Sequence, residues 1–327
     1  MTPGMPLAKR HILSDYHRIS NRLQQLHPDE QLDGIIYVET DRRYDVRCIG
    51  DLSTWAYGPL DEIKFLRSIV ETESGSNTLA GIVIWAPMHR KPAVLSEWLS
   101  LAKRIAGPKT WHRIKGCRFL LQAILTRDDF ERLVLSEAFV TNLRLLGQKG
   151  YSFDVGIDQR SAGAWQLEIM ARAMKAAHTG VPEGQRVVFI LNHLCKPDFA
   201  SHGPERDKWV RGMAALSSIE RTYVKLSGAF SELSNSIDGS QRSAVDVAAW
   251  IKDWAAHVFS CFGVDRIMFG SDWPICNLKG PRSEDSWVVW KEVVETLLGD
   301  PDFGLDETAR QAVWQTTAVK AYRLGGE

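Results

Sequence analysis

Short apolar runs alternate with longer amphipathic segments along almost the whole chain. The short runs are rich in β-branched residues and predict buried strands, whereas the longer segments carry apolar residues at helical spacing. The predicted strands are residues 34–40, 79–86, 113–121, 151–157, 186–193, 222–227 and 267–269. The predicted helices are residues 12–26, 60–72, 93–105, 128–149, 165–178, 205–219, 243–262, 284–298 and 306–322.

Strands that alternate with helices of this size are typical of βαβ units and of a parallel sheet. The chain offers seven predicted strands, and a closed parallel barrel needs eight. Residues 12–26 predict a first helix with no strand before it, because residues 1–10 contain two prolines and no strand pattern. We therefore predict an α/β protein, a (β/α)8 TIM barrel that lacks its first strand at the N-terminus. No linker or internal repeat divides it, so we expect one domain over residues 1–327.

The charge balance and the cysteines narrow the class of protein. Forty basic residues offset forty acidic ones, which gives no electrostatic footprint for nucleic acid or for anionic lipid. The five cysteines are scattered without a CxxC pair, as in proteins with free thiols in a reducing compartment. No apolar run is long enough to span a membrane, and the N-terminus has no apolar signal core. We expect a cytoplasmic protein without nucleic-acid or membrane partners, and the sequence indicates no oligomeric state.

The strongest candidate for chemistry is Asp272, which follows the apolar run at 267–269. Gly270 ends the run, and Pro274 cannot continue a strand ladder or a helix. A carboxylate held at the end of a buried strand is costly to keep for structure alone. In parallel α/β proteins that end of the strands carries the chemistry. Trp273, beside the acid, offers an aromatic face that suits a sugar ring, although most tryptophans of this chain are expected in the core or in a pocket wall.

Two cations within the predicted strand at 113–121 are candidates for the site. Lys115 and Arg118 are three positions apart, so strict alternation puts them on opposite faces of the sheet unless Gly116 marks a bulge. Arg118 is the better candidate for the interior, because a planar guanidinium suits an oxygen-rich substrate. The alternative is an arginine that caps the barrel rim.

Other strands also carry polar residues near their ends. His193 ends the strand at 186–193 and is either a structural histidine or a ligand. Lys225 lies between two apolar neighbours and either extends to the rim or serves the site. Asp154 and Glu39 are candidates for the site or for ion pairs at the rim. The polar stretch at 232–243 predicts a mobile surface loop over the same face.

Four motifs in this order, each on its own predicted strand, carry a family resemblance. They are Lys-Gly-Cys-Arg at 115–118, Ile-Leu-Asn-His-Leu-Cys-Lys-Pro at 190–197, Tyr-Val-Lys-Leu-Ser-Gly at 223–228 and Met-Phe-Gly-Ser-Asp-Trp-Pro at 268–274. Together they resemble the amidohydrolase-related TIM-barrel hydrolases, and within them the sugar-lactonase branch. Residues 5–11 and 38–42 further resemble the fungal L-rhamnono-γ-lactonases, so the resemblance covers nearly the whole chain.

The resemblance implies roles for individual residues. The aspartate at the family's strand end matches Asp272, which would activate water and later protonate the leaving oxygen. The family's mid-barrel histidine matches His193, which would orient the substrate carbonyl or, together with Asp272, bind a divalent metal such as zinc. Some lactonases of the branch work without a tightly held metal. The family's His-x-His pair at the end of its first strand has no counterpart before residue 11, where the first strand is also missing from the pattern. The residues expected to bind substrate are Arg118, Lys225, Lys115, Asp154, Glu39 and Trp273.

Our first hypothesis is therefore a hydrolase that opens a sugar lactone, an aldonolactone such as L-rhamnono-γ-lactone, by means of water activated by Asp272. Its partner is a small-molecule substrate, and no covalent intermediate is expected because no Ser-His-Asp or Cys-His signature is present. One alternative is a metal-dependent decarboxylase or amide hydrolase on the same fold, since the fold alone does not choose the reaction. The other alternative is an inactive barrel without its first strand.

Overall fold

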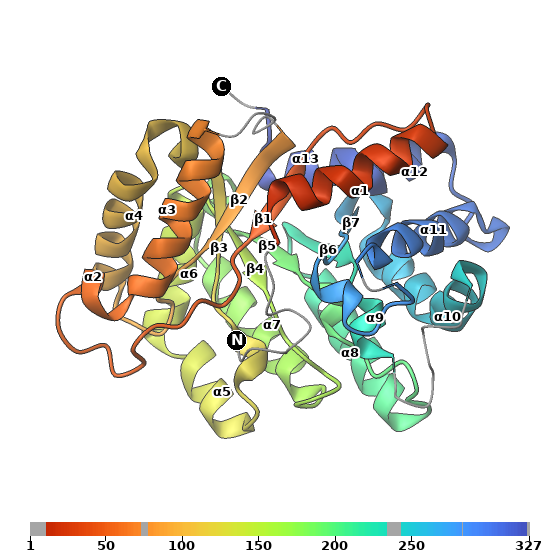
Figure 1. The fold of residues 1–327 in the computed structure, drawn as a ribbon. Helices are drawn as coiled ribbons and strands as arrows, with labels where there is room; N and C mark the ends of the chain where they lie inside the picture. The colour runs from red at the N-terminus through yellow and green to blue at the C-terminus, as the bar shows by residue number, and fades with distance from the viewer. Residues whose placement is uncertain (1–10, 73–77, 234–242, 283, 326–327) are drawn as a thin grey trace.

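The computed structural model describes residues 11–72, 78–233, 243–282 and 284–325. Within them lies one sheet of seven parallel strands, whose spatial order is the order along the chain (Figure 1). The strands are β1 (Ile35–Val38), β2 (Leu79–Trp85), β3 (Ile114–Arg118), β4 (Ser152–Val155), β5 (Val188–Leu191), β6 (Thr222–Leu226) and β7 (Ile267–Phe269). The predicted parallel α/β architecture with seven of the eight barrel strands is confirmed.

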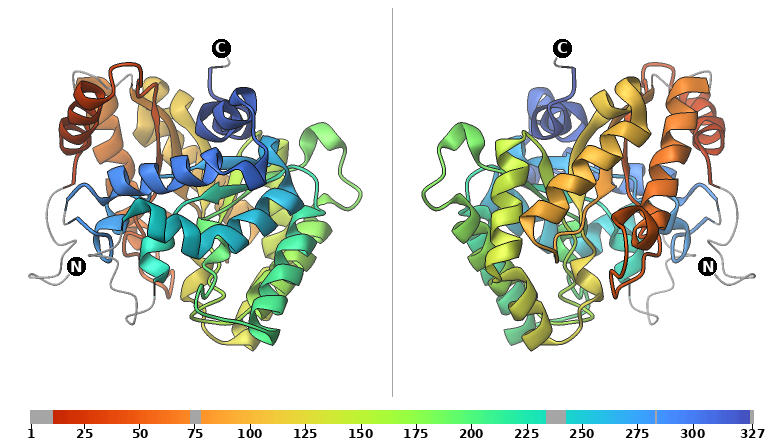
Figure 2. Two further views of the ribbon diagram at one scale, coloured as in Figure 1. Left: turned by 90° about the vertical axis from the view of Figure 1, so that its right-hand side faces the viewer. Right: turned by 90° about the vertical axis from the view of Figure 1, so that its left-hand side faces the viewer.

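Helices separate successive strands, and most of them lie on the outer side of the sheet (Figure 2). They are α1 (Leu13–Leu26), α2 (Leu52–Trp55), α3 (Tyr57–Thr72), α4 (Pro92–Arg113), α5 (Arg127–Val134), α6 (Glu137–Gln148), α7 (Trp165–His178), α8 (Pro204–Ser217), α9 (Ala229–Glu232), α10 (Ala244–Phe262), α11 (Ser286–Gly299), α12 (Glu307–Gln311) and α13 (Thr317–Tyr322). In the part of the chain that the structure describes, no helix combines the length and the apolar character needed to cross a membrane.

Two helices differ from the pattern for local reasons. The predicted helix at 128–149 is interrupted where Ser136 caps α6 and its side chain accepts a hydrogen bond from the Phe139 amide at 3.2 Å. The predicted helix at 93–105 continues as far as Arg113, because Pro108 opens a second helical segment after the kink at Gly107.

The residues of one strand divide between two apolar cores, as strand alternation requires. On β5, Phe189 and Leu191 belong to the large core between the sheet and the helices. Val188 and Ile190 belong to a smaller cluster that also contains residues of β2, β6 and β7. Strands from different parts of the sheet therefore meet on its inner, concave face. This smaller cluster also includes Tyr322 of the last helix, so α13 packs against the inside of the sheet.

The carboxyl ends of the parallel strands open toward one side, the lower side in Figure 1. The loop predicted at 232–243 begins on that side, but the expectation of a mobile surface loop is wrong for Glu232. This residue ends helix α9 and its side chain is almost fully buried. Residues 234–242 lie outside the described part of the chain.

Candidate active site at the carboxyl ends of the strands

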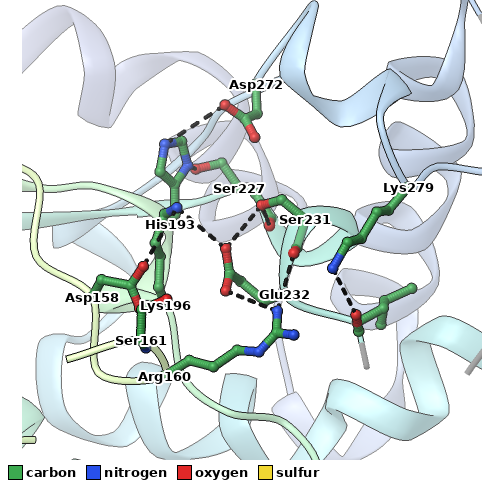
Figure 3. A network of polar contacts seen from close by, with 12 residues as sticks. Asp158, Arg160, Ser161, His193, Lys196, Ser227, Ser231, Glu232, Asp272 and Lys279 are labelled. Carbon is green, nitrogen blue, oxygen red and sulfur yellow. Dashed lines mark hydrogen bonds and ion pairs between the residues drawn. The ribbon is translucent and has the colours of Figure 1, made fainter. Parts of the chain in front are cut away.

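His193 and Asp272 meet at the carboxyl ends of two strands. His193 follows β5 and Asp272 follows β7, with β6 between them. The Nε2 atom of His193 lies 3.6 Å from the Oδ1 atom of Asp272 (Figure 3). Both side chains are largely buried, with 18% and 11% of their surfaces exposed. An imidazole and a carboxyl group from distant parts of the chain therefore lie close together and largely shielded from water.

Both residues have left-handed backbone conformations. Four consecutive residues, His193 to Lys196, have φ between 48° and 59°, and Asp272 has φ of 53°. Such angles cost roughly 1–2 kcal/mol for each non-glycine residue and persist only where the surroundings enforce them. The turn is held by hydrogen bonds from the Gln159 and Arg160 amides to the Cys195 and Lys196 carbonyls, at 3.2 and 3.1 Å. Strain concentrated at these residues is typical of a functional site.

Ser227 and Gly228, which follow β6, fix the imidazole of His193. Its Nδ1 atom lies 2.9 Å from the Ser227 hydroxyl oxygen, which leaves Nε2 directed at Asp272. Gly228 has φ of 73°, and a Cβ atom at that position would lie 2.6 Å from Nδ1. The absence of a side chain at Gly228 therefore lets the ring of His193 lie against its backbone.

Burial gives the two groups opposite protonation behaviour. Burial, helped by the charges of Lys196, Lys225 and Arg118, holds the pKa of His193 well below its usual 6.5. Burial raises the pKa of Asp272 from 3.8 to about 7, against the opposing effect of Lys196. At neutral pH the imidazole is therefore neutral, and the carboxyl group can both accept and release a proton.

Arg118 and Glu39 form a buried ion pair on the inner face. The Nε atom of Arg118 lies 2.5 Å from the Glu39 carboxylate, and its Nη2 atom donates to the Glu39 carbonyl at 2.7 Å. The Glu39 side chain is fully buried, and its other oxygen accepts from the Asp41 amide at 2.6 Å. The pair joins the end of β1 to the end of β3.

Lys225 and Asp154 form a second buried pair, between β6 and β4. The Lys225 ammonium lies 2.6 Å from the Asp154 carboxylate, which is fully buried. The hydroxyl of Tyr322 donates to the same carboxylate at 2.9 Å. Burial and this carboxylate hold the pKa of Tyr322 well above 10. The last helix of the chain thus contributes a side chain to the inner polar network.

Two other predicted site residues lie elsewhere. Lys115 is near the amino end of β3, where burial and the charge of Arg323 lower its pKa, and it lines a cavity of about 670 Å³ on that side. The structure does not bring it to His193. Trp273 is next to Asp272 in the chain, but its ring packs edge-on against the rings of His11 and Tyr16, each at 5.4 Å between centroids.

Lys196 and Glu232 are part of the site, although our sequence analysis did not select them. The Lys196 ammonium lies 3.3 Å from the Glu232 carboxylate and 3.8 Å from that of Asp158 (Figure 3). Lys196 stands three positions after His193 in a recognised motif, which was a usable signal. Glu232 stood at the start of a polar stretch that resembled an exposed loop. Ser227 lies in the recognised motif at 223–228, which was a usable signal of the same kind.

The donor atoms do not complete a metal site. Catalytic zinc sites usually have three protein ligands and one open position. Across residues 11–72, 78–233, 243–282 and 284–325, no group of three or more His, Cys, Asp or Glu side chains converges as a metal requires. His193 and Asp272 supply two donors, and the next polar groups are the Ser227 hydroxyl and the Lys196 ammonium. This donor set does not fit the predicted zinc-like ion, so we derive no chemical step through a metal.

Comparisons with known proteins show the family of this chain. The family model for amidohydrolases matches residues 112–324. The chain is 28% identical to L-rhamnono-γ-lactonase of Scheffersomyces stipitis, over 98% of this chain and 92% of that protein. It is 26% identical to L-fucono-1,5-lactonase of Burkholderia ambifaria, over 79% and 75%. A solved amidohydrolase of Burkholderia multivorans with bound zinc has the same fold, with a TM-score of 0.67 and 22% identity over 97% of this chain and 90% of that one.

Proposed function

Because this chain belongs to the amidohydrolase family and is similar to two sugar lactonases over most of its length, we propose that it hydrolyses a sugar lactone. One observation carries the proposal. A neutral imidazole and a carboxyl group with a pKa of about 7 lie 3.6 Å apart at the strand ends. This pair suits a reaction that needs a base in its first half and an acid in its second half.

Asp272 is the base of the first step. In its ionised form it removes a proton from a water molecule while the oxygen of that water attacks the lactone carbonyl. The pKa of about 7 matches this task, because at neutral pH a large fraction of Asp272 is ionised and its basicity is far above that of an ordinary aspartate.

His193 orients the lactone carbonyl. The neutral imidazole has Nδ1 at the Ser227 hydroxyl, so its Nε2 atom lies on the side of Asp272 and donates a hydrogen bond to the carbonyl oxygen when the proton is on Nε2. The depressed pKa keeps the ring neutral throughout the cycle, so His193 does not compete with Asp272 for the proton. The oxygen becomes negative as the tetrahedral intermediate forms, which strengthens this hydrogen bond.

The second step returns the proton. The bond between the former carbonyl carbon and the ring oxygen breaks, and Asp272 protonates that oxygen as a new hydroxyl group. The product is an open-chain aldonic acid, which ionises in solution. Water supplies both the new carboxyl oxygen and the proton on the new hydroxyl, and the enzyme ends the cycle unchanged.

L-Rhamnono-γ-lactone is the proposed substrate, since the relative that aligns over 98% of this chain is named for that lactone. The test measures acid release from this lactone by the wild type and by Asp272→Asn, after subtraction of spontaneous hydrolysis. Loss of the general base is expected to lower kcat by about 100-fold or more. Asp253→Asn on the exposed side of α10 is the matched control and should keep full activity. Equal turnover by Asp272→Asn and the wild type would remove Asp272 from this role, and a wild type inactive on lactones would refute the function.

A further inference from the structure

Three cations surround His193 and Asp272, and they differ in how firmly they are held. Arg118 and Lys225 each lie within 2.6 Å of a fully buried carboxylate. The Lys196 ammonium has two acidic neighbours, at the longer distances of 3.3 Å to Glu232 and 3.8 Å to Asp158. Charged hydrogen bonds between nitrogen and oxygen are usually 2.7–2.9 Å long. Lys196 is therefore the most loosely paired cation of the three.

The carboxylates beside Lys196 also have other partners. Glu232 accepts from the Ser231 hydroxyl at 3.0 Å and pairs with Arg160 at 3.4 Å. Asp158 accepts from the Ser161 amide at 2.7 Å. A Lys196 ammonium that turned away would leave Asp158 with the Ser161 amide and Glu232, its nearer partner, with the Arg160 guanidinium, so Glu232 would still be paired with a cation.

The corresponding movement of Arg118 or Lys225 would be costly. Without its cation, the Glu39 carboxylate would keep a hydrogen bond from the Asp41 amide, and the Asp154 carboxylate would keep one from the Tyr322 hydroxyl. Both of these donors are neutral. Both carboxylates are fully buried, so loss of their cation is expected to cost several kcal/mol. These two pairs are better suited to holding the inner face in shape than to following a reacting group.

Lys196 is also close to His193 and Asp272. It ends the left-handed turn that begins at His193, and Figure 3 draws its ammonium between the imidazole and the two carboxylates. Of the neighbouring charges, it is the one that most lowers the pKa of both His193 and Asp272, which indicates its closeness to both.

We propose that Lys196 is a catalytic residue whose ammonium turns from Glu232 and Asp158 to stabilise the oxyanion of the tetrahedral intermediate and then the carboxylate of the aldonate product. This inference rests on the proposed lactone hydrolysis. The lactone is neutral, whereas the intermediate and the product carry a negative charge. A cation that turns inward therefore favours the charged states over the bound substrate, which is the condition for catalysis.

The decisive variant is Lys196→Met, which keeps an unbranched side chain one atom shorter than lysine and removes the charged nitrogen. We expect kcat to fall by about 100-fold or more, as for the removal of an oxyanion-hole donor, with a KM for the neutral lactone within about threefold of the wild type. Inhibition by the aldonate product should weaken by at least about tenfold. The acid limb of the pH profile should move to higher pH, because Asp272 loses the cation that lowers its pKa.

Lys279→Met is the matched control, because Lys279 contacts the Leu233 carbonyl at 3.4 Å and has no place in the proposed mechanism. Circular dichroism and thermal unfolding check that each variant folds. If Lys196→Met is unstable, Lys196→Ala with added ethylammonium replaces it, and a saturable recovery of kcat supports the role. An active wild type with a Lys196→Met kcat within tenfold of it overturns this inference alone, and so does a loss confined to KM. A wild type without lactonase activity overturns the proposed function itself.

Discussion

At the scale of single residues, desolvation determines the chemistry of this site more than any charge does. It is the largest influence on both His193 and Asp272, and it acts in opposite directions because it disfavours the charged form of each. An imidazole becomes a poorer base, and a carboxyl group becomes a poorer acid. The nearby cations lower both pKa values, but the pKa of Asp272 stays above that of His193, as burial alone would place it.

The activity should therefore rise with pH around neutrality. The base form of Asp272 is required, and its pKa is about 7, so kcat/KM is expected to be half-maximal near pH 7 and to level off above it. His193 adds no second limb in this range because its pKa is depressed. The measurement is kcat/KM for the lactone in overlapping buffers, with spontaneous hydrolysis subtracted. A half-maximal value near pH 4, as for an ordinary aspartate, would contradict this assignment.

Asp272 should also reduce stability at alkaline pH. Its pKa is about 7 in the folded chain and 3.8 ordinarily, so the folded state holds the proton more tightly between these values. Stability is therefore highest below pH 3.8 with respect to this group, and it falls as the pH rises toward 7. Asn cannot ionise, so Asp272→Asn should exceed the wild type at pH 8 by a few kcal/mol of unfolding free energy, about 4 at most.

The two proteins should become equal as the pH approaches 4, provided that the rest of the molecule stays folded. Urea unfolding at pH 8 and pH 5 measures the difference. An Asp272→Asn variant that is less stable than the wild type at pH 8 would mean that the carboxylate is better solvated or paired than its burial indicates.

At the scale of secondary-structure elements, the ends of β5, β6 and β7 together position one imidazole. The strained turn after β5 presents the ring, Ser227 after β6 holds Nδ1, and Asp272 after β7 faces Nε2. The helix α9 starts immediately at Gly228 and ends with the buried Glu232. The geometry of the site thus depends on three connections that are far apart in the chain.

Replacement of Gly228 by alanine should therefore damage the site more than the fold. An added Cβ would lie 2.6 Å from Nδ1 of His193, so the ring must move away from Ser227. We expect kcat to fall by about tenfold or more, with a loss of about 1–2 kcal/mol of unfolding free energy from the left-handed backbone at φ 73°.

Gly304→Ala is the control for this variant. Gly304 has a similar left-handed conformation, with φ of 59°, and a Cβ atom there would meet nothing within 4 Å. It should lose similar stability and keep its activity. Equal activities of the Gly228→Ala and Gly304→Ala variants would show that His193 does not need its observed place.

At the scale of the whole molecule, the sequence predicted the architecture better than it predicted the contacts between side chains. The apolar runs predicted all seven strands, because each strand is mostly apolar and its pattern is local. The pairing of His193 with Ser227, the burial of Glu232 and the contact of Tyr322 with Asp154 were not predictable. Each joins segments far apart in the chain, and no local pattern records which of several polar residues will meet across a sheet.

Strict alternation does not hold along β3. The register with β2 shifts between the Ile82–Ile114 and Val83–Gly116 pairs, so Lys115 lies at an irregularity of the kind that Gly116 was expected to mark. Arg118 reaches the inner network through Glu39, whereas Lys115 lies by the amino end of the same strand next to Arg323. The planar guanidinium favoured Arg118 over Lys115 for the interior, but the sequence could not say that Arg118 would be tied so closely to a carboxylate. That pairing is what makes Lys196, which the sequence analysis left aside, the better candidate for contact with the reacting group.

The strand order of the sheet predicts that backbone amides are protected to different degrees against hydrogen exchange. In the described part of the chain, β1 and β7 are the outer strands, and each pairs with a single neighbour, whereas β4 and β5 pair on both sides. All four residues of β1 are also only partly buried, and those of β4 and β5 are fully buried. Amides on an edge are released by smaller local openings than amides in the centre of a sheet.

Hydrogen–deuterium exchange followed by mass spectrometry should therefore show faster exchange for peptides over Ile35–Val38 than for peptides over Ser152–Val155 or Val188–Leu191. The difference is expected to be about tenfold or more in rate, which corresponds to about 1.4 kcal/mol in the free energy of opening. Equal protection at β1 and β5 at all protein concentrations would mean that the edge is paired within the molecule. Protection of β1 that grows with concentration would mean that a second chain adds to the edge, as exposed strands tend to permit.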